Sequence, residues 1–259
     1  MALLASEDPR SSTELFSASL EGDYDDEAPW QAVAALRLRG TVEVFELAAE
    51  YCRATDAKAR ARGLDVLAQL GEGKPHSERP YLDKCVSIAI SSLEDGEPMV
   101  VHSAAWALAH LRTDEATSRL LRLRDHPQAG VRQAVATGLG GAVHKSPECV
   151  AVLIELMDDP DEDVRDWATF GLGSLSGEDS PKIREALQRR LDDPFEPARS
   201  EAVWGLAHRR DRTGLRMLLE RLESGTRLAG DEDAAEEILG LESNRPIEDI
   251  CRGMKKLLG

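Results

Sequence analysis

The stretch DDPDEDVRDWATFGLG, residues 158–173, decides the fold. Asp and Pro are favoured where helices begin, because they satisfy free amide groups or need no partner there, and acids suit the positive end of the helix dipole. Val164, Ala168 and Leu172 then follow at a spacing of four residues, which places them on one helical face. The stretch therefore predicts a turn followed by a helix with one buried face.

The same pattern recurs along the chain. VRQAVATGLGGA begins at Val131 and ARSEAVWGLAHR begins at Ala198, and both align with VRDWATFGLGSL from Val164. When the leucine of this motif is numbered 0, the register extends to seven leucines: Leu36, Leu67, Leu108, Leu139, Leu172, Leu206 and Leu239. The steps are 31, 41, 31, 33, 34 and 33 residues, and the longest contains GEGKPHSERP (71–80), which predicts a loop insertion. This period indicates a stack of repeats.

A second apolar segment precedes these helices, as at 42–52, 81–93, 149–157, 183–191 and 215–222. Strand signals are weak, because β-branched residues do not alternate with polar ones. We therefore predict an all-α fold, an α-solenoid in which about seven helix pairs form a right-handed superhelix. A single repeat domain would fill residues 1–259, with a flexible start at 1–10, repeats over 11–242 and a capping helix at 246–258.

The pattern D-D-P-x-x-x-V-R-x-x-A-x-x-G-L-G resembles the HEAT repeat, in particular the bacterial HEAT-like repeats first associated with phycobilisome lyases. Residues 158–173 match it almost completely, and the resemblance covers most of the chain. It implies the fold of stacked helix pairs. The family includes scaffolds, transport receptors, DNA glycosylases, bilin lyases and a diiron hydroxylase, so the resemblance leaves the function open.

The charge of the chain excludes several classes of protein. Asp and Glu number 48 against 32 Lys and Arg, for a formal net charge of −16, which disfavours binding to nucleic acid or to an anionic membrane. No apolar run approaches the ~18–20 residues of a membrane helix, and the start MALLASEDPR lacks the basic region of a signal peptide. We expect a cytoplasmic protein, and the preference for Arg over Lys favours a GC-rich bacterial host.

The sequence predicts no catalytic residue, no metal and no cofactor. The cysteines are far apart, lack a C-x-x-C pair and read as buried, reduced thiols: Cys52, Cys85, Cys149 and Cys251. None of the six histidines is followed by Glu, whereas the diiron hydroxylase that this fold resembles uses His-Glu dipeptides. The glycine-rich stretches at 138–142 and 171–177 are interpreted as crowded helix positions rather than phosphate-binding loops.

An arginine recurs seven residues before the register leucine in four repeats: Arg60, Arg132, Arg165 and Arg199. The DNA-glycosylase relatives suggest a ladder facing phosphates. The alternative is a structural ladder in which each arginine bridges to an acidic turn of the adjacent repeat, and the many surrounding acids favour this second interpretation.

In each predicted pair, the helix that carries the register leucine is the second along the chain. Positions −6 and −2 of these second helices point away from the buried face, toward the predicted concave surface of the solenoid. Four of the eleven aromatic residues fall in these two columns, and such rings dominate binding hot spots. The columns predict a set of partner-binding residues: Trp30, His102, Trp106, Gln133, Asp166, Phe170 and Trp204. The alternative is that these rings fill gaps between neighbouring helices.

These observations predict a non-enzymatic scaffold or adaptor that binds a protein or peptide partner on its concave face. Acidic residues gather at 1–30 and 231–237, either as polar caps that keep the solenoid soluble or to steer a basic partner. A bilin-lyase-like enzyme or enzyme subunit is the main alternative. A nucleic-acid-binding protein of the same fold is a weaker one.

Overall fold

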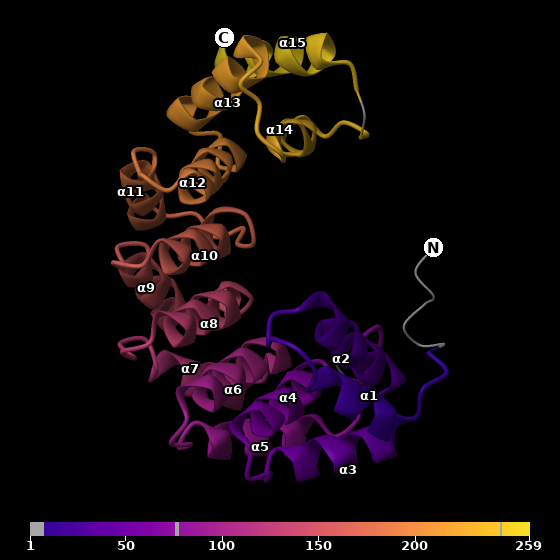
Figure 1. Cartoon of the computed structure of the whole chain (residues 1–259). Helices are drawn as coiled ribbons and strands as arrows, with labels where there is room; N and C mark the ends of the chain where they lie inside the picture. Colours follow the sequence, from indigo (N-terminus) through magenta and orange to yellow (C-terminus); the bar gives the residue numbers. More distant parts are fainter. Residues whose placement is uncertain (1–7, 76–77, 244) are drawn as a thin grey trace. The chain divides into compact units, whose positions relative to one another are not determined.

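The computed structural model describes residues 8–75, 78–243 and 245–259, which fold into helices and connecting turns (Figure 1). Within these ranges no strand is present, and the predicted all-α class is confirmed. The contacts divide the chain into two compact units, Met1–Gly138 (unit 1) and Leu139–Gly259 (unit 2). The single repeat domain expected over 1–259 stays a prediction.

Unit 1 is built from helix pairs. The first helices of its pairs are α1 (Ser12–Ser19), α3 (Val42–Tyr51), α5 (Leu82–Ser92) and α7 (Asp114–Leu121). The second helices are α2 (Glu27–Arg39), α4 (Ala57–Ala68), α6 (Pro98–Leu111) and α8 (Ala129–Gly140), whose last two residues fall in unit 2. Helix α2 packs on α4, and α4 packs on α6.

Unit 2 continues the same plan. After a short 3₁₀ helix, η3 (Val143–Lys145), come the pairs α9 (Pro147–Leu156) with α10 (Glu162–Gly173), α11 (Pro181–Arg190) with α12 (Glu196–His208), and α13 (Arg212–Ser224) with α14 (Asp231–Leu239). Helix α15 (Ile247–Leu258) packs on α13 and α14, with Ile250 and Met254 fully buried. The described residues thus show the predicted helix pairs, and α15 occupies the range given for the capping helix, whose capping role stays a prediction.

The register predicted from the sequence is the core of the fold. The leucines from Leu36 to Leu206 are fully buried, and Leu239 is half-buried. The small residues four positions earlier are buried as well, from Ala32 to Ala235. Burying a leucine contributes about 1.5–3 kcal/mol, so each repeat depends on its neighbours for most of its stability.

Glycine permits the closest approach between second helices in unit 2. A methyl group on Gly205 of α12 would lie 2.6 Å from the Cα of Gly173 in α10, too close for any side chain. Gly173 is the last residue of α10 and not part of a strand-to-helix turn. The interpretation as a crowded helix segment therefore holds for residues 171–173, whereas residues 174–177 follow the helix and Gly177 has no atom within 4 Å of an added methyl group.

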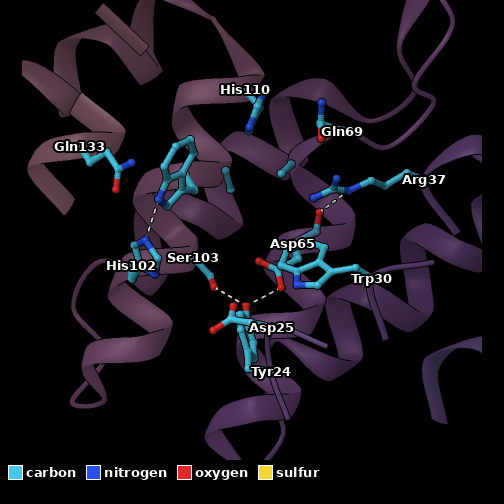
Figure 2. A pocket seen from close by; sticks show the side chains of 13 residues that line it. Tyr24, Asp25, Trp30, Arg37, Asp65, Gln69, His102, Ser103, His110 and Gln133 are labelled. Atoms are coloured by element: carbon cyan, nitrogen blue, oxygen red, sulfur yellow. Dashed lines mark hydrogen bonds between the residues drawn. The ribbon is translucent and has the colours of Figure 1, made fainter. Parts of the chain in front are cut away.

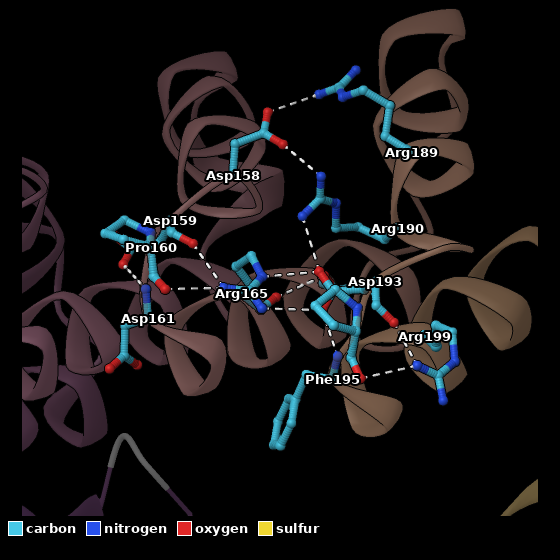
Figure 3. A network of polar contacts seen from close by, with 12 residues as sticks. Asp158, Asp159, Pro160, Asp161, Arg165, Arg189, Arg190, Asp193, Phe195 and Arg199 are labelled. Carbon is cyan, nitrogen blue, oxygen red and sulfur yellow. Dashed lines mark hydrogen bonds and ion pairs between the residues drawn. The ribbon is translucent and has the colours of Figure 1, made fainter.

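The recurring arginines tie each turn to its own helix and, as Arg165 shows, to the next turn (Figure 3). Nη1 of Arg165 donates to the carbonyl oxygens of Asp159 and Pro160 at 2.9 and 3.2 Å. Nε and Nη2 of the same guanidinium donate to the carboxylate of Asp193 at 2.9 and 3.1 Å. One Asp193 oxygen also accepts the amide of Phe195 at 2.9 Å, immediately before α12 begins.

The other ladder arginines repeat this geometry. Arg60 donates to the carbonyls of Ala54 and Thr55 and forms an ion pair with Asp95 at 2.8 Å. Arg132 and Arg199 donate to the two carbonyls at the corresponding positions of their own turns. These partners support the structural ladder rather than a row of arginines reserved for phosphates.

We expect Arg165→Ala to lower the free energy of unfolding by about 1.5–3 kcal/mol, because it removes charge-assisted hydrogen bonds from a buried carboxylate that keeps its ion pair with Arg190 at 3.0 Å. The Arg165 and Asp193 side chains are 10% and 0% exposed. Urea unfolding followed by circular dichroism measures the change. Arg189→Ala is the control, because Arg189 pairs with Asp158 at 3.2 Å where both side chains are exposed, and about 0–1 kcal/mol is expected. Equal losses would contradict the ladder.

Candidate functional site

The second helices of unit 1 surround a pocket of about 340 Å³ (Figure 2). Its lining comes from α2, α4, α6 and α8, together with Tyr24 and Asp25 from the loop before α2. The volume lies at the lower end of the range for ligand pockets. Four of the seven predicted binding residues meet in this pocket: Trp30, His102, Trp106 and Gln133.

A buried polar network around Asp65 forms one side of the pocket (Figure 2). The Tyr24 hydroxyl donates to Oδ2 of Asp65 at 2.5 Å, and Nη1 of Arg62 donates to the same oxygen at 3.2 Å. The Ser103 hydroxyl lies 2.9 Å from the Tyr24 oxygen. Burial raises the pKa of the Asp65 carboxyl, whereas the Tyr24 hydrogen bond and the charges of Arg37 and Arg62 lower it.

Arg62 holds the loop that carries Tyr24. Its Nε donates to the carbonyl of Ser19 at 2.9 Å, and its Nη2 donates to the carbonyl of Tyr24. The guanidinium also lies 3.8 Å from the centre of the Tyr24 ring and 4.7 Å from that of Trp30. Arg62 is fully buried, so it fixes the shape of the pocket without lining it.

Helix α6 supplies an aromatic wall of His102, Trp106 and His110, spaced four residues apart. Nε1 of Trp106 donates to Nε2 of His102 at 2.6 Å, and the Trp106 and His110 rings stack with their centres 5.9 Å apart. Burial lowers the pKa of His102, and it lowers the pKa of His110 to about 4 with help from the charges of Arg37 and Arg112. Both imidazoles are therefore neutral at neutral pH, as the hydrogen bond from Trp106 requires.

Arg37 also lines the pocket, and it was not among the predicted site residues. Its Nε donates to the backbone carbonyl of Asp65 at 2.9 Å, and its guanidinium end is directed into the pocket (Figure 2). One sequence signal marks it. Arg37 directly follows a register leucine, where every other repeat has Ala or Gly: Ala68, Ala109, Gly140, Gly173, Ala207 and Gly240.

The remaining predicted residues, Asp166, Phe170 and Trp204, lie in unit 2, where Trp204 is a packing residue. It contacts the apolar core of α13–α15, and its Nε1 donates to Oδ1 of Asp231 at 2.8 Å. Asp231 lies eight positions before the register leucine Leu239, where the other repeats have Ala or Val. It is fully buried because it accepts hydrogen bonds from Trp204 and from the amide of Leu228, the latter at 2.9 Å.

The residues at positions −6 and −2 of the second helices are less exposed than the sequence suggests. Trp30, Trp106, Phe170 and Trp204 are half-buried, and Asp65 in the same columns is buried. The reason is that second helices pack directly on one another, as α4 does on α6 and α10 on α12. Phe170 is also covered by Trp167 of its own helix α10, whose ring centre lies 5.7 Å away, edge to face.

Two carboxyl groups of unit 2 have raised pKa values. Burial raises the pKa of Asp166 to about 6, and the nearby charges of Asp163, Glu196 and Asp193 add to this. Oδ1 of Asp166 is buried and has no hydrogen-bond partner within the described chain. Burial raises the pKa of Glu201 to about 7, although its carboxylate accepts the Ser174 hydroxyl at 2.6 Å. Both groups therefore change charge close to neutral pH.

These raised values predict a pH dependence of stability. Both folded-state pKa values exceed the unfolded ones, so the contribution is complete below about pH 4 and is lost as the pH rises through about 6–7. We expect the double variant Asp166→Asn, Glu201→Gln to gain about 1 kcal/mol at about pH 8 and little at about pH 4, because solvent screens half-buried carboxylates. Urea unfolding at a series of pH values tests this. Glu185→Gln, at an exposed position of α11, is the control, and an unchanged pH slope in the double variant would refute the assignment.

Other kinds of site find little support in the described ranges. There, no group of three His, Cys, Asp or Glu side chains is arranged to hold a metal ion, and no helix is long and apolar enough to span a membrane. The four cysteines are free, and none lines the pocket. Burial raises the pKa of both Cys52 and Cys85 to about 12, which suppresses the nucleophilic thiolate.

Comparison with known proteins finds matches along the repeats. The model for HEAT repeats matches residues 120–184 and 150–238, and the model for the PBS lyase HEAT-like repeat matches residues 100–126. The last range includes the aromatic wall of α6. Protein YibA of Escherichia coli (strain K12) is 26% identical over 222 residues, which cover 83% of this chain and 76% of that relative.

Solved structures share the architecture. The X-ray structure of YibA has a TM-score of 0.69 at 23% identity, over 96% of this chain and 92% of the other. An archaeal HEAT-like repeats protein from Thermococcus onnurineus NA1 has a TM-score of 0.50 at 18% identity, over 97% and 99% of the two chains. The complex of CpcE and CpcF of phycocyanin lyase from Nostoc sp. PCC7120 gives 0.51 at 16% identity, over 100% and 99%. At these identities the likeness concerns the fold.

Proposed function

Because the chain belongs to the HEAT-repeat family, whose stacked helices form extended binding surfaces, we propose that it is a non-enzymatic scaffold or adaptor for a protein or peptide partner. The observation that supports this proposal is the pocket of unit 1, to which four successive second helices contribute side chains. A pocket of this volume has room for one or two side chains of an extended segment. The repeats around it would contact the rest of that segment.

The pocket has the features of an anchor site. Trp30 and Trp106 line it while remaining half-buried, so part of each ring is available for contact. Trp is among the residues that contribute most to binding energy, especially where a pocket desolvates the inserted group. The polar groups of Gln69, Gln133 and Ser103 lie among these rings and would orient the inserted side chain.

Unit 2 offers a cluster of acidic side chains, which supports a basic segment in the partner. Besides burial, the charges of Asp163 and Glu196 raise the pKa of Asp166, and the charge of Asp166 in turn raises the pKa of Glu201. A Lys or Arg side chain placed among them would relieve that repulsion. Phe170, half-buried on the same helix as Asp166, could contact the aliphatic part of such a side chain.

We also propose a bacterial, cytoplasmic protein that does not bind nucleic acid. The free, largely buried thiols are typical of a reducing compartment. The net charge of −16 opposes phosphate binding, and Arg60 and Arg165 are already engaged by Asp95 and Asp193. Passage of the protein through a heparin column without retention at moderate salt is the expected outcome.

We expect Trp106→Ala to weaken partner binding at least about 30-fold, the cost of losing a hot-spot ring of about 2 kcal/mol. The immobilised wild-type protein selects binders from a phage-displayed library of random peptides, and fluorescence polarisation compares the affinity of the selected peptides for the variants. Tyr51→Ala is the control and should bind as the wild type does, because this half-buried ring of unit 1 lies outside the pocket, 4.4 Å from the ring of Phe16. Circular dichroism checks folding. A failure to select any consensus, or equal binding by Trp106→Ala, would overturn the proposal.

A bilin-lyase-like enzyme is the second candidate. The observation in its favour is that the PBS lyase HEAT-like match covers 100–126, which includes the part of α6 that lines the pocket. A free bilin mixed with the protein would then show a shifted visible absorption band, and Trp106→Ala would abolish the shift. An unchanged spectrum would remove this candidate.

A further inference from the structure

Two arginines beside the pocket of unit 1 differ in how far their charge is matched. Arg62 spends all its guanidinium nitrogens on Ser19, Tyr24 and Asp65, including the Asp65 carboxylate. Arg37, within the described part of the chain, hydrogen bonds only through Nε, and its acceptor is a backbone carbonyl. Its two terminal nitrogens therefore have no hydrogen-bond acceptor there, although the guanidinium is the part of the side chain directed into the pocket, where it lies 5.6 Å from the centre of the Trp30 ring (Figure 2).

The surroundings of Arg37 make an unmatched charge costly. Burial lowers its pKa, against the smaller opposing influence of the charges on Asp65 and Glu72. The carboxylate of Asp65 is already bound by Tyr24 and Arg62, and no carboxylate lies within ion-pair distance of Arg37 in the described residues. A guanidinium with two free, parallel donors matches a carboxylate, which accepts both in a bidentate pair.

From this geometry we propose that the pocket binds a carboxylate of the partner peptide, with Arg37 as its receptor. This proposal rests on the proposed function and names the chemistry of the anchor. The carboxylate would meet the terminal nitrogens of Arg37, and the carbon chain that bears it would lie against Trp30 and Trp106. The neutral imidazole of His110 and the amide of Gln69 also line the pocket and supply further donors.

The charges around the pocket favour a monoanion over a phosphate group. Asp65 and Asp25 both line it, and a second negative charge on the ligand would be placed near them without a further unmatched cation. Arg37 supplies one unmatched positive charge, which one carboxylate neutralises. The carboxylate has two sources in a peptide, a Glu or Asp side chain and the C-terminus.

Peptide pools separate these sources. Three pools of random peptides of one length carry a fixed central Glu with blocked ends, a fixed central Gln with blocked ends, or a central Gln with a free C-terminal carboxylate. Retention on the immobilised full-length protein is read by mass spectrometry. We expect at least one carboxylate pool to be retained about 10-fold more than the blocked Gln pool, the scale of a charge-assisted bidentate pair. Enrichment of the first pool identifies a side chain, and enrichment of the third identifies a C-terminus.

Variants assign the effect to Arg37. Arg37→Met should abolish the preference for carboxylate, and Arg37→Lys should keep part of it because a charge without the fork remains. Arg122→Met removes an exposed arginine of the same unit outside the pocket and should keep the full preference. Circular dichroism and thermal unfolding confirm that each variant is folded. Retention of the blocked Gln pool above the level of a blank resin, and equal to that of both carboxylate pools, would overturn the proposal.

A small-molecule probe keeps the result independent of peptide binding. Phenylacetate and phenylacetamide differ only in the carboxylate, and the indole N–H signals of Trp30 and Trp106 report occupancy of the pocket by NMR. Phenylacetate should shift these signals at concentrations about 10-fold lower than phenylacetamide does, and the difference should vanish in Arg37→Met. If this holds while no peptide is retained, the peptide scaffold fails and the carboxylate site stands. Equal shifts by both probes would reject the carboxylate site.

Discussion

The stacking of this chain depends on one recurring interaction, made by a hydrogen-bonded arginine at the start of the second helix in four of the repeats. A single guanidinium reaches the two carbonyls of its own turn, and in Arg60 and Arg165 the remaining nitrogens bind an aspartate in the turn between the two helices of the next pair. This aspartate accepts amides at the start of the following helix, as Asp193 does from Phe195. The planar, always charged guanidinium suits this role, because five donors in fixed directions satisfy a turn that would otherwise leave carbonyls unpaired. Small residues and leucines then fill the contacts between helices.

The pocket of unit 1 is a departure from that repeated pattern. Its special residues stand where neighbouring repeats have small or apolar ones: Arg37 where other repeats have Ala or Gly, and Asp65 where the adjacent repeats have Ala34 and Trp106. Arg62 compensates the buried carboxylate of Asp65 and holds the loop of Tyr24 in place. A buried charge at a position where other repeats are small or apolar needs a compensating partner. Arg62 and Asp65 provide that for one another, and in unit 2 Arg221 does so for Asp231 at 3.5 Å, beside the hydrogen bond that Trp204 donates.

Much of the fold is predictable from the sequence, because a helical repeat imposes the same requirements on every copy. The period places the register leucines, the loop at 71–80 and the last helix, and the acids around the ladder arginines indicate their structural role. The site is only partly predictable. The columns at −6 and −2 identify Trp30, His102, Trp106 and Gln133, yet they give no indication that Trp204 packs against Asp231. Periodicity describes one helix, whereas burial of a ring depends on the distance to the next helix, which Gly173 and Gly205 set through backbone contact.

The way the pocket is assembled restricts how this chain can evolve. Arrays of this kind change length by gaining or losing whole repeats, since each repeat contacts only its neighbours. The pocket draws its lining from α2, α4, α6 and α8, one second helix from each of four consecutive pairs. A duplication or deletion within those pairs would move Trp30 and Gln133 by one repeat relative to each other and destroy the pocket while leaving every helix contact of the standard kind intact. Unit 1 is thus locked in its repeat number by its pocket, although the stacking rules alone would permit a longer or shorter chain.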